Sequence, residues 1–293
     1  MSGLKEIRVR IASVTSTRQI TNAMKMVSAS KLRRAQDAIL QMRPYAGKLQ
    51  EILAHVSDVL SDDEDNVYIR KKDPERVLLV VITSNRGLCG AFNANVLRRT
   101  LHLIHEDYNE LSRTGNLHLF TIGKKGSDYL VRKKYNVTDI RNDLFDGLSF
   151  KSAAAVAEEL IDKFVTNKYD KIVLVYNQFK NAAVQTLATE QFLPTEVPEK
   201  KEGNHLIQDY IFEPSKDFIV RELIPKSLKI GLYKALLDSK ASELGARMTA
   251  MHHATDNATE LIRDLKLNYN KARQATITKE LLEIVSGSEA LKA

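Results

Sequence analysis

Both ends of the chain carry long, almost uninterrupted helical patterns, and this feature constrains the fold more than any other. Between residues 4 and 60 there is one proline, Pro44, and one glycine, Gly47, among many strong helix formers. A continuous helix of that length extends roughly 85 Å, and a second stretch, from Lys226 to Ser286, extends roughly 90 Å at about 1.5 Å per residue. Two helices of matching length can bury their apolar stripes by pairing as an antiparallel coiled coil.

Apolar residues in both stretches recur at alternating steps of three and four, which is the spacing of a coiled-coil seam. In the first stretch the seam lapses from Thr15 to Arg34 into small, polar and basic residues. Pro44 is expected to bend the first helix, and Pro225 to kink or restart the second. The predicted seam positions are Leu4, Ile7, Ile11, Val14, Ala35, Ala38, Met42, Tyr45, Leu49, Ile52, Val56 and Val59 in the first helix, and Leu237, Ala241, Leu244, Met248, Met251, Thr255, Ala258, Ile262, Leu265, Tyr269 and Ala272 in the second, with only Thr255 out of character.

The middle of the chain alternates short apolar runs with amphipathic stretches. Continuous apolar runs such as VLLVVI indicate strands buried on both faces, and their alternation with helices predicts a small parallel-sheet α/β domain of Rossmann-like type. We expect strands at residues 76–83, 116–123 and 170–179, helices at 93–113, 124–135 and 152–169, and an added edge strand at 183–194. The predicted division is a first coiled-coil helix (1–60), an inserted α/β domain (61–214) and a second coiled-coil helix (215–293), with loops at 61–66 and 194–204.

The first helix is strongly basic within a chain of formal net charge +7. Residues 1–50 contain Glu6 and Asp37 as their only acidic residues, against Lys5, Arg8, Arg10, Arg18, Lys25, Lys31, Arg33, Arg34, Arg43 and Lys48. Such a run is ordinarily a solvated face. The mixture of methionine, small residues and cations in TNAMKMVSASKLRRA instead suits a partner's acidic wall, because methionine adapts in shape and arginine supplies charge.

No active site of its own is evident in the chain. The turn TSNRGLCGAFN occupies the place of a Rossmann phosphate loop, but Gly87 and Gly90 do not complete a G-x-G-x-x-G or P-loop pattern, so a tight strand-to-helix turn is favoured over a nucleotide site. His252 and His253 are adjacent and cannot chelate one ion together, and His252 with Asp256 lacks further ligands, so neither a metal nor another cofactor is expected. The single cysteine, Cys89, excludes an internal disulfide and suits a small buried residue.

Two further features concern location. The opening MSGLKEIRVRIASV has no continuous apolar segment and no cleavage site, so a complete, unexported chain is expected. The longest apolar run, Val77–Ile82, is far shorter than the roughly 20 residues that cross a bilayer. Membrane association is therefore expected only through partners.

Three long motifs resemble the gamma subunit, the central rotor shaft, of F-type ATP synthases. ITNAMKMVSASKLRRA is similar to the amino-terminal signature of that family, SNRGLCGAFN to its mid-chain turn, and RMTAMHHATDNATELIRDLKLNYNKARQATITKELLEIVSG to its carboxy-terminal signature. The chain departs from the family at Asn85, where aspartate is usual, at Ala91, where a second glycine is usual, and at Ser288, where alanine is usual. The two-cysteine insertion of the chloroplast type is missing, so the resemblance is to the bacterial form without thiol regulation.

The resemblance implies a mechanism and partners. In this family the coiled coil turns inside a ring of alternating alpha and catalytic beta subunits, while the α/β domain sits on the membrane c-ring beside the epsilon subunit. The asymmetric shaft drives each beta subunit through its nucleotide states, and the shaft itself makes and breaks no bond. Such a subunit lies peripherally on the cytoplasmic side of the cell inner membrane.

The resemblance also assigns roles to residues of this chain. Contacts with a beta subunit are implied for Met24, Lys25, Arg33, Arg34, Arg273 and Gln274. An apolar sleeve at the top of the ring, acting as a bearing, would hold Ile277, Leu281, Leu282, Ile284 and Val285, and a foot near the c-ring would include Glu213.

Two other classes of function compete with a mechanical subunit. A nucleic-acid tether could use the basic helix and would bind with steep salt dependence, but the chain lacks stacking aromatics and a groove-reading motif. A Rossmann-type enzyme with coiled-coil dimerisation arms would bind NAD through the central domain.

Overall fold

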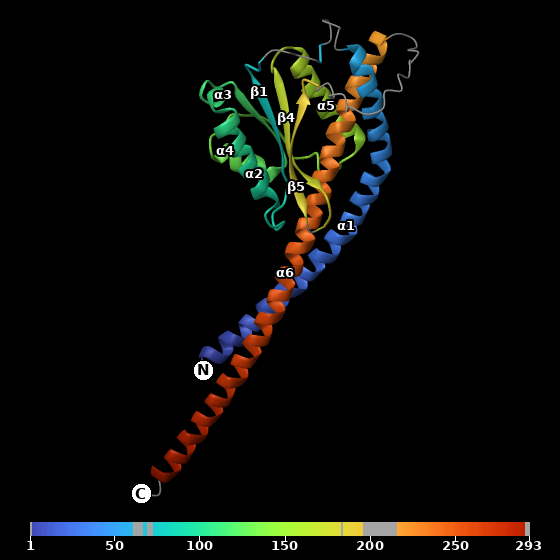
Figure 1. Ribbon diagram of the computed structural model, residues 1–293. Coiled ribbons are helices and arrows are strands. Elements are labelled where there is room, and N and C mark those ends of the chain that lie inside the picture. The colour runs from blue at the N-terminus through green and yellow to red at the C-terminus, as the bar shows by residue number, and fades with distance from the viewer. Residues whose placement is uncertain (1, 61–66, 69–72, 183, 196–215, 291–293) are drawn as a thin grey trace. The chain divides into compact units, whose positions relative to one another are not determined.

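The computed structural model describes residues 2–60, 67–68, 73–182, 184–195 and 216–290, with some side chains near the helix ends left undescribed. The chain divides into two compact units, one formed by Met1–Ala29 with Arg247–Ala293 and the other by Ser30–Ala246. Two long helices contribute to both units: α1 spans Ser2–Leu60 and α6 spans Lys216–Ala290 (Figure 1). Each helix is continuous through its internal proline, so α6 does not restart at Pro225. Within the described residues no helix is both long and apolar enough to span a membrane.

A five-stranded sheet in the order β3-β2-β1-β4-β5 organises the larger unit. The first four strands are mutually parallel, as predicted, and the predicted edge strand β5 runs antiparallel to β4. Sequence analysis missed β3, because its five residues alternate between half-buried and exposed and form no apolar run. The strands are β1 (Val77–Ile82), β2 (Leu117–Ile122), β3 (Val137–Arg141), β4 (Lys171–Phe179) and β5 (Gln185–Leu193).

Helices cover both faces of this sheet. One face carries α2 (Phe92–His102), the π-helical turn η1 (Leu103–Asp107), α3 (Asn109–Arg113) and α4 (Lys124–Arg132). The other carries α5 (Phe150–Val165) and the amino-terminal part of α6 (Figure 1). The single helix expected at 93–113 is therefore interrupted by η1, a feature that helical periodicity did not reveal.

The continuous apolar run of β1 is explained by this two-sided cover. Leu78, Val80 and Ile82 pack toward α5 and α6, whereas Val77, Leu79 and Val81 pack toward α2 and α4, and all six are fully buried. The long helix α6 completes the first of these cores with Leu228, Leu232 and Leu236. Because the stretch of α6 from Ile224 to Leu236 belongs to this core, α6 is anchored to the sheet by side-chain packing.

In the larger unit, α1 buries a seam that differs in part from the predicted one. Ala35 and Leu49 are buried as expected, but Leu32 and Ile39 are buried too, while Ala38 is half-buried and Tyr45 is 49% exposed. The predicted phase was wrong at Tyr45, and beside Ala38 the larger Ile39 takes the buried position. The predicted positions Ile52, Val56 and Val59 lie outside the residues whose side chains are described.

In the smaller unit, α1 and α6 pair in antiparallel fashion. Arg8 hydrogen-bonds to Tyr269, and Thr255 to Thr21, so residue numbers rise along α1 where they fall along α6. On α6 the predicted seam is confirmed within this unit: Met251, Ala258, Ile262 and Leu265 are buried. The coiled coil expected from the terminal patterns is therefore present.

We expect His118 to make the stability of the larger unit depend on pH. Its Nδ1 is buried without a hydrogen-bond partner among the described residues, and its ring packs edge-on against Tyr169 at 5.4 Å. Burial, reinforced by the neighbouring Lys168, lowers the pKa of His118 below its ordinary 6.5. The unfolded chain therefore binds more protons below pH 6.5, and the free energy of unfolding should fall as the pH drops from 6.5 through the lowered pKa.

Urea denaturation followed by tyrosine fluorescence at several pH values would test this. His118→Phe should flatten the dependence, whereas His105→Gln, at an exposed histidine of the same unit, should preserve it. An unchanged slope in His118→Phe would assign the acid sensitivity to other groups.

Candidate functional site

The last turns of α6 expose a band of apolar side chains. Arg273 and Gln274 are exposed just before it. Ile277, Leu281 and Ile284 fall one above another on the helix, while Leu282 and Val285 widen the stripe. Their exposed fractions range from 48% to 67%: Ile277 48%, Leu281 58%, Leu282 62%, Ile284 67% and Val285 54%. A contiguous apolar surface on the chain alone marks a place where another molecule binds.

The coiled coil of the smaller unit has a polar layer where the sequence showed a lapse. The spacing of three and four continues through Arg18, Thr21, Lys25 and Ser28, of which Thr21 and Ser28 are buried and the other two half-buried. The Thr255 hydroxyl donates to Thr21 Oγ1 at 2.9 Å, and the Thr21 hydroxyl donates to the Arg18 carbonyl at 3.0 Å. Thr255 therefore lies opposite Thr21 in a polar layer. The seam continues through this layer with polar side chains in place of apolar ones.

Opposite this polar seam, α1 presents apolar residues to the outside. Ile20 and Val27 are seven residues apart on one face of the helix and are 58% and 54% exposed, and Met26 is 58% exposed. An ordinary amphipathic helix has the reverse arrangement, with apolar residues inside. These outward residues were not singled out in the sequence, although the absence of an apolar stripe was the signal that could have found them.

The residues predicted to contact a beta subunit occupy different environments. Met24 and Lys25 are half-buried, and the spacing from Thr21 places Lys25 on the seam side. Arg33 and Arg34, which belong to the larger unit, are both exposed, as are Arg273 and Gln274 in the smaller unit. Glu213 lies outside the described residues.

Arg8 and Tyr269 form a contact that the sequence did not reveal. Arg8 Nη2 donates to the Tyr269 hydroxyl at 2.9 Å, and the guanidinium lies 5.8 Å from the ring centroid. The hydrogen bond from Arg8, aided by the charge of Arg273, lowers the pKa of Tyr269. The contact fixes the register of the two helices four residues before Arg273.

The polar side chains of the turn after β1 accept hydrogen bonds from neighbouring backbone groups of the fold. The Ser84 N–H donates to Asn93 Oδ1 at 3.0 Å, the Lys124 N–H to Asn85 Oδ1 at 3.1 Å and the Gly126 N–H to Thr83 Oγ1 at 2.9 Å. The last two donors belong to the first turn of α4, where free N–H groups commonly hold a phosphate. They are therefore not available to a phosphate in this conformation.

The three departures from the family pattern have local explanations. Asn85 uses both ends of its amide, since Nδ2 also donates to the Asn142 carbonyl at 2.7 Å, which an aspartate could not do. Ala91 has φ −82°, so no glycine is required there. Ser288 lies exposed near the end of α6, and the positive φ angles of the turn fall at Leu88 (61°) and Gly90 (58°).

His252 and Asp256, the pair considered as metal ligands, are not joined by further ligands among the described residues. His252 Nδ1 lies 3.3 Å from Asp256 Oδ2, one helical turn away, and both side chains are more than half exposed. No group of three or more histidine, cysteine, aspartate or glutamate side chains suited to a metal occurs in the described part of the chain. Cys89 is buried, as predicted, beside Ser84 and Asn93.

The polar layer predicts a coupled effect of the two threonines on stability. Thr21→Val or Thr255→Val alone should lower the free energy of unfolding of the coiled coil by about 1 kcal/mol or less, because one hydroxyl loses its partner across the seam. The double Val variant should recover this loss or exceed wild type, since two apolar side chains then meet in the seam. Thermal unfolding followed by far-ultraviolet circular dichroism would measure this double-mutant cycle. Strictly additive losses would show that the two hydroxyls do not interact.

The chain is similar to known proteins over almost its whole length. The family model described as ATP synthase matches residues 3–291. The chain is 57% identical to the ATP synthase gamma chain of Christiangramia forsetii, with 99% of both chains covered, and 47% identical to that of a Geobacter species, with both fully covered.

Solved structures agree with the sequence relatives. A chain in a Euglena gracilis mitochondrial ATP synthase structure of OSCP, F1 and c-ring gives a TM-score of 0.70 at 24% identity, covering 99% of this chain and 95% of that one. A chain of the Tetrahymena thermophila mitochondrial ATP synthase central stalk and c-ring gives a TM-score of 0.59 at 28% identity, covering 80% of this chain and 99% of that one. The Euglena match supports the fold, and the Tetrahymena match extends the likeness to a central stalk.

Proposed function

The chain belongs to the ATP synthase gamma-chain family, and on this premise we propose how it acts as the central-stalk subunit of an F-type ATP synthase. Its partners are the alpha and beta subunits, the epsilon subunit and the c-ring. The chain carries torque from the c-ring to the catalytic subunits, and it makes and breaks no bond itself. ATP synthesis and ion transport belong to the complex, of which this chain is one component.

The observation that carries the proposal is the exposed apolar band at the end of α6. Five large aliphatic side chains, each at least 48% exposed, would be unfavourable on a free helix end and become favourable inside an apolar ring. We assign Ile277, Leu281, Leu282, Ile284 and Val285 to a bearing, and Arg273 and Gln274 to a hydrogen-bonded contact with one beta subunit just below it.

The inverted amphipathicity of α1 supports a second contact. Ile20, Met26 and Val27 offer an adaptable apolar surface beside Met24, and Arg33 with Arg34 offer charge to an acidic segment of the beta subunit. A shaft that contacts one conformation of a partner better than the others shifts the population toward that conformation. Rotation of an asymmetric shaft would then impose a different state on each beta subunit in turn.

A purely mechanical role is supported by the turn after β1. Its donors and acceptors bind one another, as the bonds of Thr83, Ser84 and Asn85 illustrate. The competing Rossmann enzyme would bind a dinucleotide at the turn after β1, where the Ser84 N–H already donates to Asn93 Oδ1 and the Phe92 N–H to the Cys89 carbonyl. The relatives are bacterial and the structural neighbours include c-rings, so we place the subunit peripherally on the cytoplasmic side of the cell inner membrane. Glu213 remains our proposal for the foot near the c-ring.

Purification from native membranes tests the proposal. The tagged chain should bring down alpha and beta subunits in stoichiometric amounts with ATPase activity in the eluate, while the isolated chain hydrolyses no ATP. A chain that instead carries nucleic acid, and loses it at high salt, would favour the tether hypothesis. Saturable binding of NAD or ATP to the isolated chain would contradict the mechanical role.

A further inference from the structure

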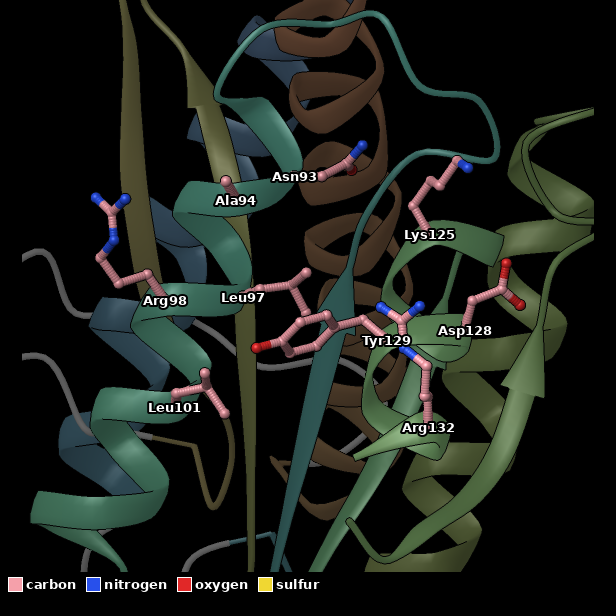
Figure 2. Close-up of a pocket in the computed structure, with 9 residues that line it drawn as sticks. All are labelled: Asn93, Ala94, Leu97, Arg98, Leu101, Lys125, Asp128, Tyr129 and Arg132. Atoms are coloured by element: carbon pink, nitrogen blue, oxygen red, sulfur yellow. The ribbon is translucent and has the colours of Figure 1, made fainter. Parts of the chain in front are cut away.

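A groove between α2 and α4 is not used by the fold or by the rotor role. Its volume is about 610 Å³, and its lining comes from the outer faces of the two helices (Figure 2). Leu97 and Leu101 of α2 and Tyr129 of α4 are half-buried and form its apolar floor. Figure 2 shows Leu97 and Tyr129 pointing toward one another across the space between the helices.

The rim of this groove is basic. Arg98, Lys125 and Arg132 are exposed, and none of the three makes an ion pair within the part of the chain that the structure describes. The single acidic lining residue, Asp128, lies between Lys125 and Arg132 on α4. Some cations elsewhere on this unit are paired, as Lys163 is with Asp139 at 2.7 Å and with Glu159 at 2.8 Å. The lining of the groove therefore has three cationic residues and one acidic residue, and its net charge is positive.

The spacing of the charges selects the kind of ligand. Lys125 lies in the first turn of α4 and Arg132 in its last, seven residues or about 10.5 Å apart along the axis and on the same face. A single phosphate would engage both side chains only by drawing them together, and it would leave the half-buried apolar floor uncovered. A helix with acidic residues two turns apart matches both cations, and its apolar residues would cover Leu97, Leu101 and Tyr129.

We propose that the α2–α4 groove docks an acidic amphipathic helix of a partner protein. The partner helix carries carboxylates seven residues apart, a basic residue between them opposite Asp128, and aliphatic side chains toward the floor. The apolar contacts set its orientation, since reversal would leave the outer pair of charges matched but would displace the apolar side chains from Leu97. The inference does not rest on the rotor role, because it follows from the surface of the larger unit alone.

Fluorescence anisotropy with the purified full chain tests the proposal. The probe is a labelled, stapled helical peptide with Glu, Arg and Glu at positions 1, 4 and 8 of its acidic face and leucines on the adjoining face. Its control has the same composition in scrambled order. We expect the matched peptide to bind about tenfold or more tightly than the scrambled one at low salt, and to weaken as salt screens the rim.

Charge-reversed variants make the test specific. Lys125→Glu with Arg132→Glu should weaken binding by about tenfold or more, whereas Lys151→Glu with Lys180→Glu, an equal charge change at exposed sites outside the groove, should change it less than about twofold. A peptide with lysines in place of the glutamates should bind the groove variant better than it binds wild type, which an unfolded variant could not do. Circular dichroism verifies the fold of each variant.

Three outcomes would overturn the proposal. Equal binding of matched and scrambled peptides would show that net charge alone attracts them. Equal weakening by the two pairs of reversals would place the contact elsewhere. Displacement of the peptide by inorganic triphosphate at one-to-one stoichiometry, with tighter binding of the triphosphate, would make the groove a small-anion site.

Discussion

Replacing the five apolar residues at the end of α6 by glutamine should reduce ATP synthesis by the assembled enzyme several-fold. The variant changes Ile277, Leu281, Leu282, Ile284 and Val285, which are at least 48% exposed in the chain alone. Glutamine keeps the helix, because its helix propensity is close to that of leucine, but it removes the apolar surface that a bearing would bury. Loss of that surface should let the shaft tilt or slip under load.

The control for this variant changes charge in the same turns. Lys279→Gln, Glu280→Gln and Glu283→Gln remove charged groups of which Lys279 and Glu283 pair only loosely, at 3.7 Å, on an exposed surface. These substitutions should leave ATP synthesis nearly unchanged, because exposed pairs of this kind contribute little. Equal losses of ATP synthesis in both variants would mean that the apolar character of the end of α6 is not required.

A truncation separates the tip from the rest of the chain. Deleting residues 269–293 should weaken assembly or torque transmission while the larger unit keeps its fold, since all its core residues lie outside the deleted segment. Circular dichroism and limited proteolysis would follow the α/β unit. Collapse of that unit on deletion would contradict an independent role for the tip.

The substitution Gly123→Ala should have the largest effect on stability, at about 3 kcal/mol or more. Gly123 joins β2 to α4 with φ 101°, which is unfavourable for any residue with a Cβ atom. A Cβ added there would lie 2.1 Å from the Thr83 carbonyl oxygen, and this backbone atom cannot rotate away. Either the end of β1 moves or the turn opens, and both break the bonds between the two loops.

Gly147→Ala provides the matched control. Its added Cβ would meet no heavy atom within 4 Å, and its φ is not in the positive range. The free energy of unfolding from urea titration should therefore stay within about 0.5 kcal/mol of wild type. A small effect of Gly123→Ala would show that the β1 and β2 turns are more adaptable than this close approach indicates.

Periodicity alone determined the regular parts of this protein. The alternating steps of three and four predicted both terminal helices and the seam of α6 from Met251 to Leu265, because a long helix leaves a repeating signature in its own sequence. Continuous apolar runs predicted β1, β2 and β4 in the same way, since a strand covered on both faces has no polar side. Two of the three motifs that carry the family resemblance lie on α1 and α6, and the third forms the turn after β1.

Tertiary structure decided the features that depend on partners distant in the sequence. The short strand β3 and the π-helical turn η1 have no local signature in the sequence. Thr21 and Thr255, which pair with each other, each interrupt the apolar pattern of a separate helix. A hydroxyl is unfavourable in an apolar seam until another hydroxyl lies opposite, and no single stretch of sequence contains both. The α2–α4 groove arises likewise, because folding brings Arg98 and Arg132 from separate helices to the rim of one surface.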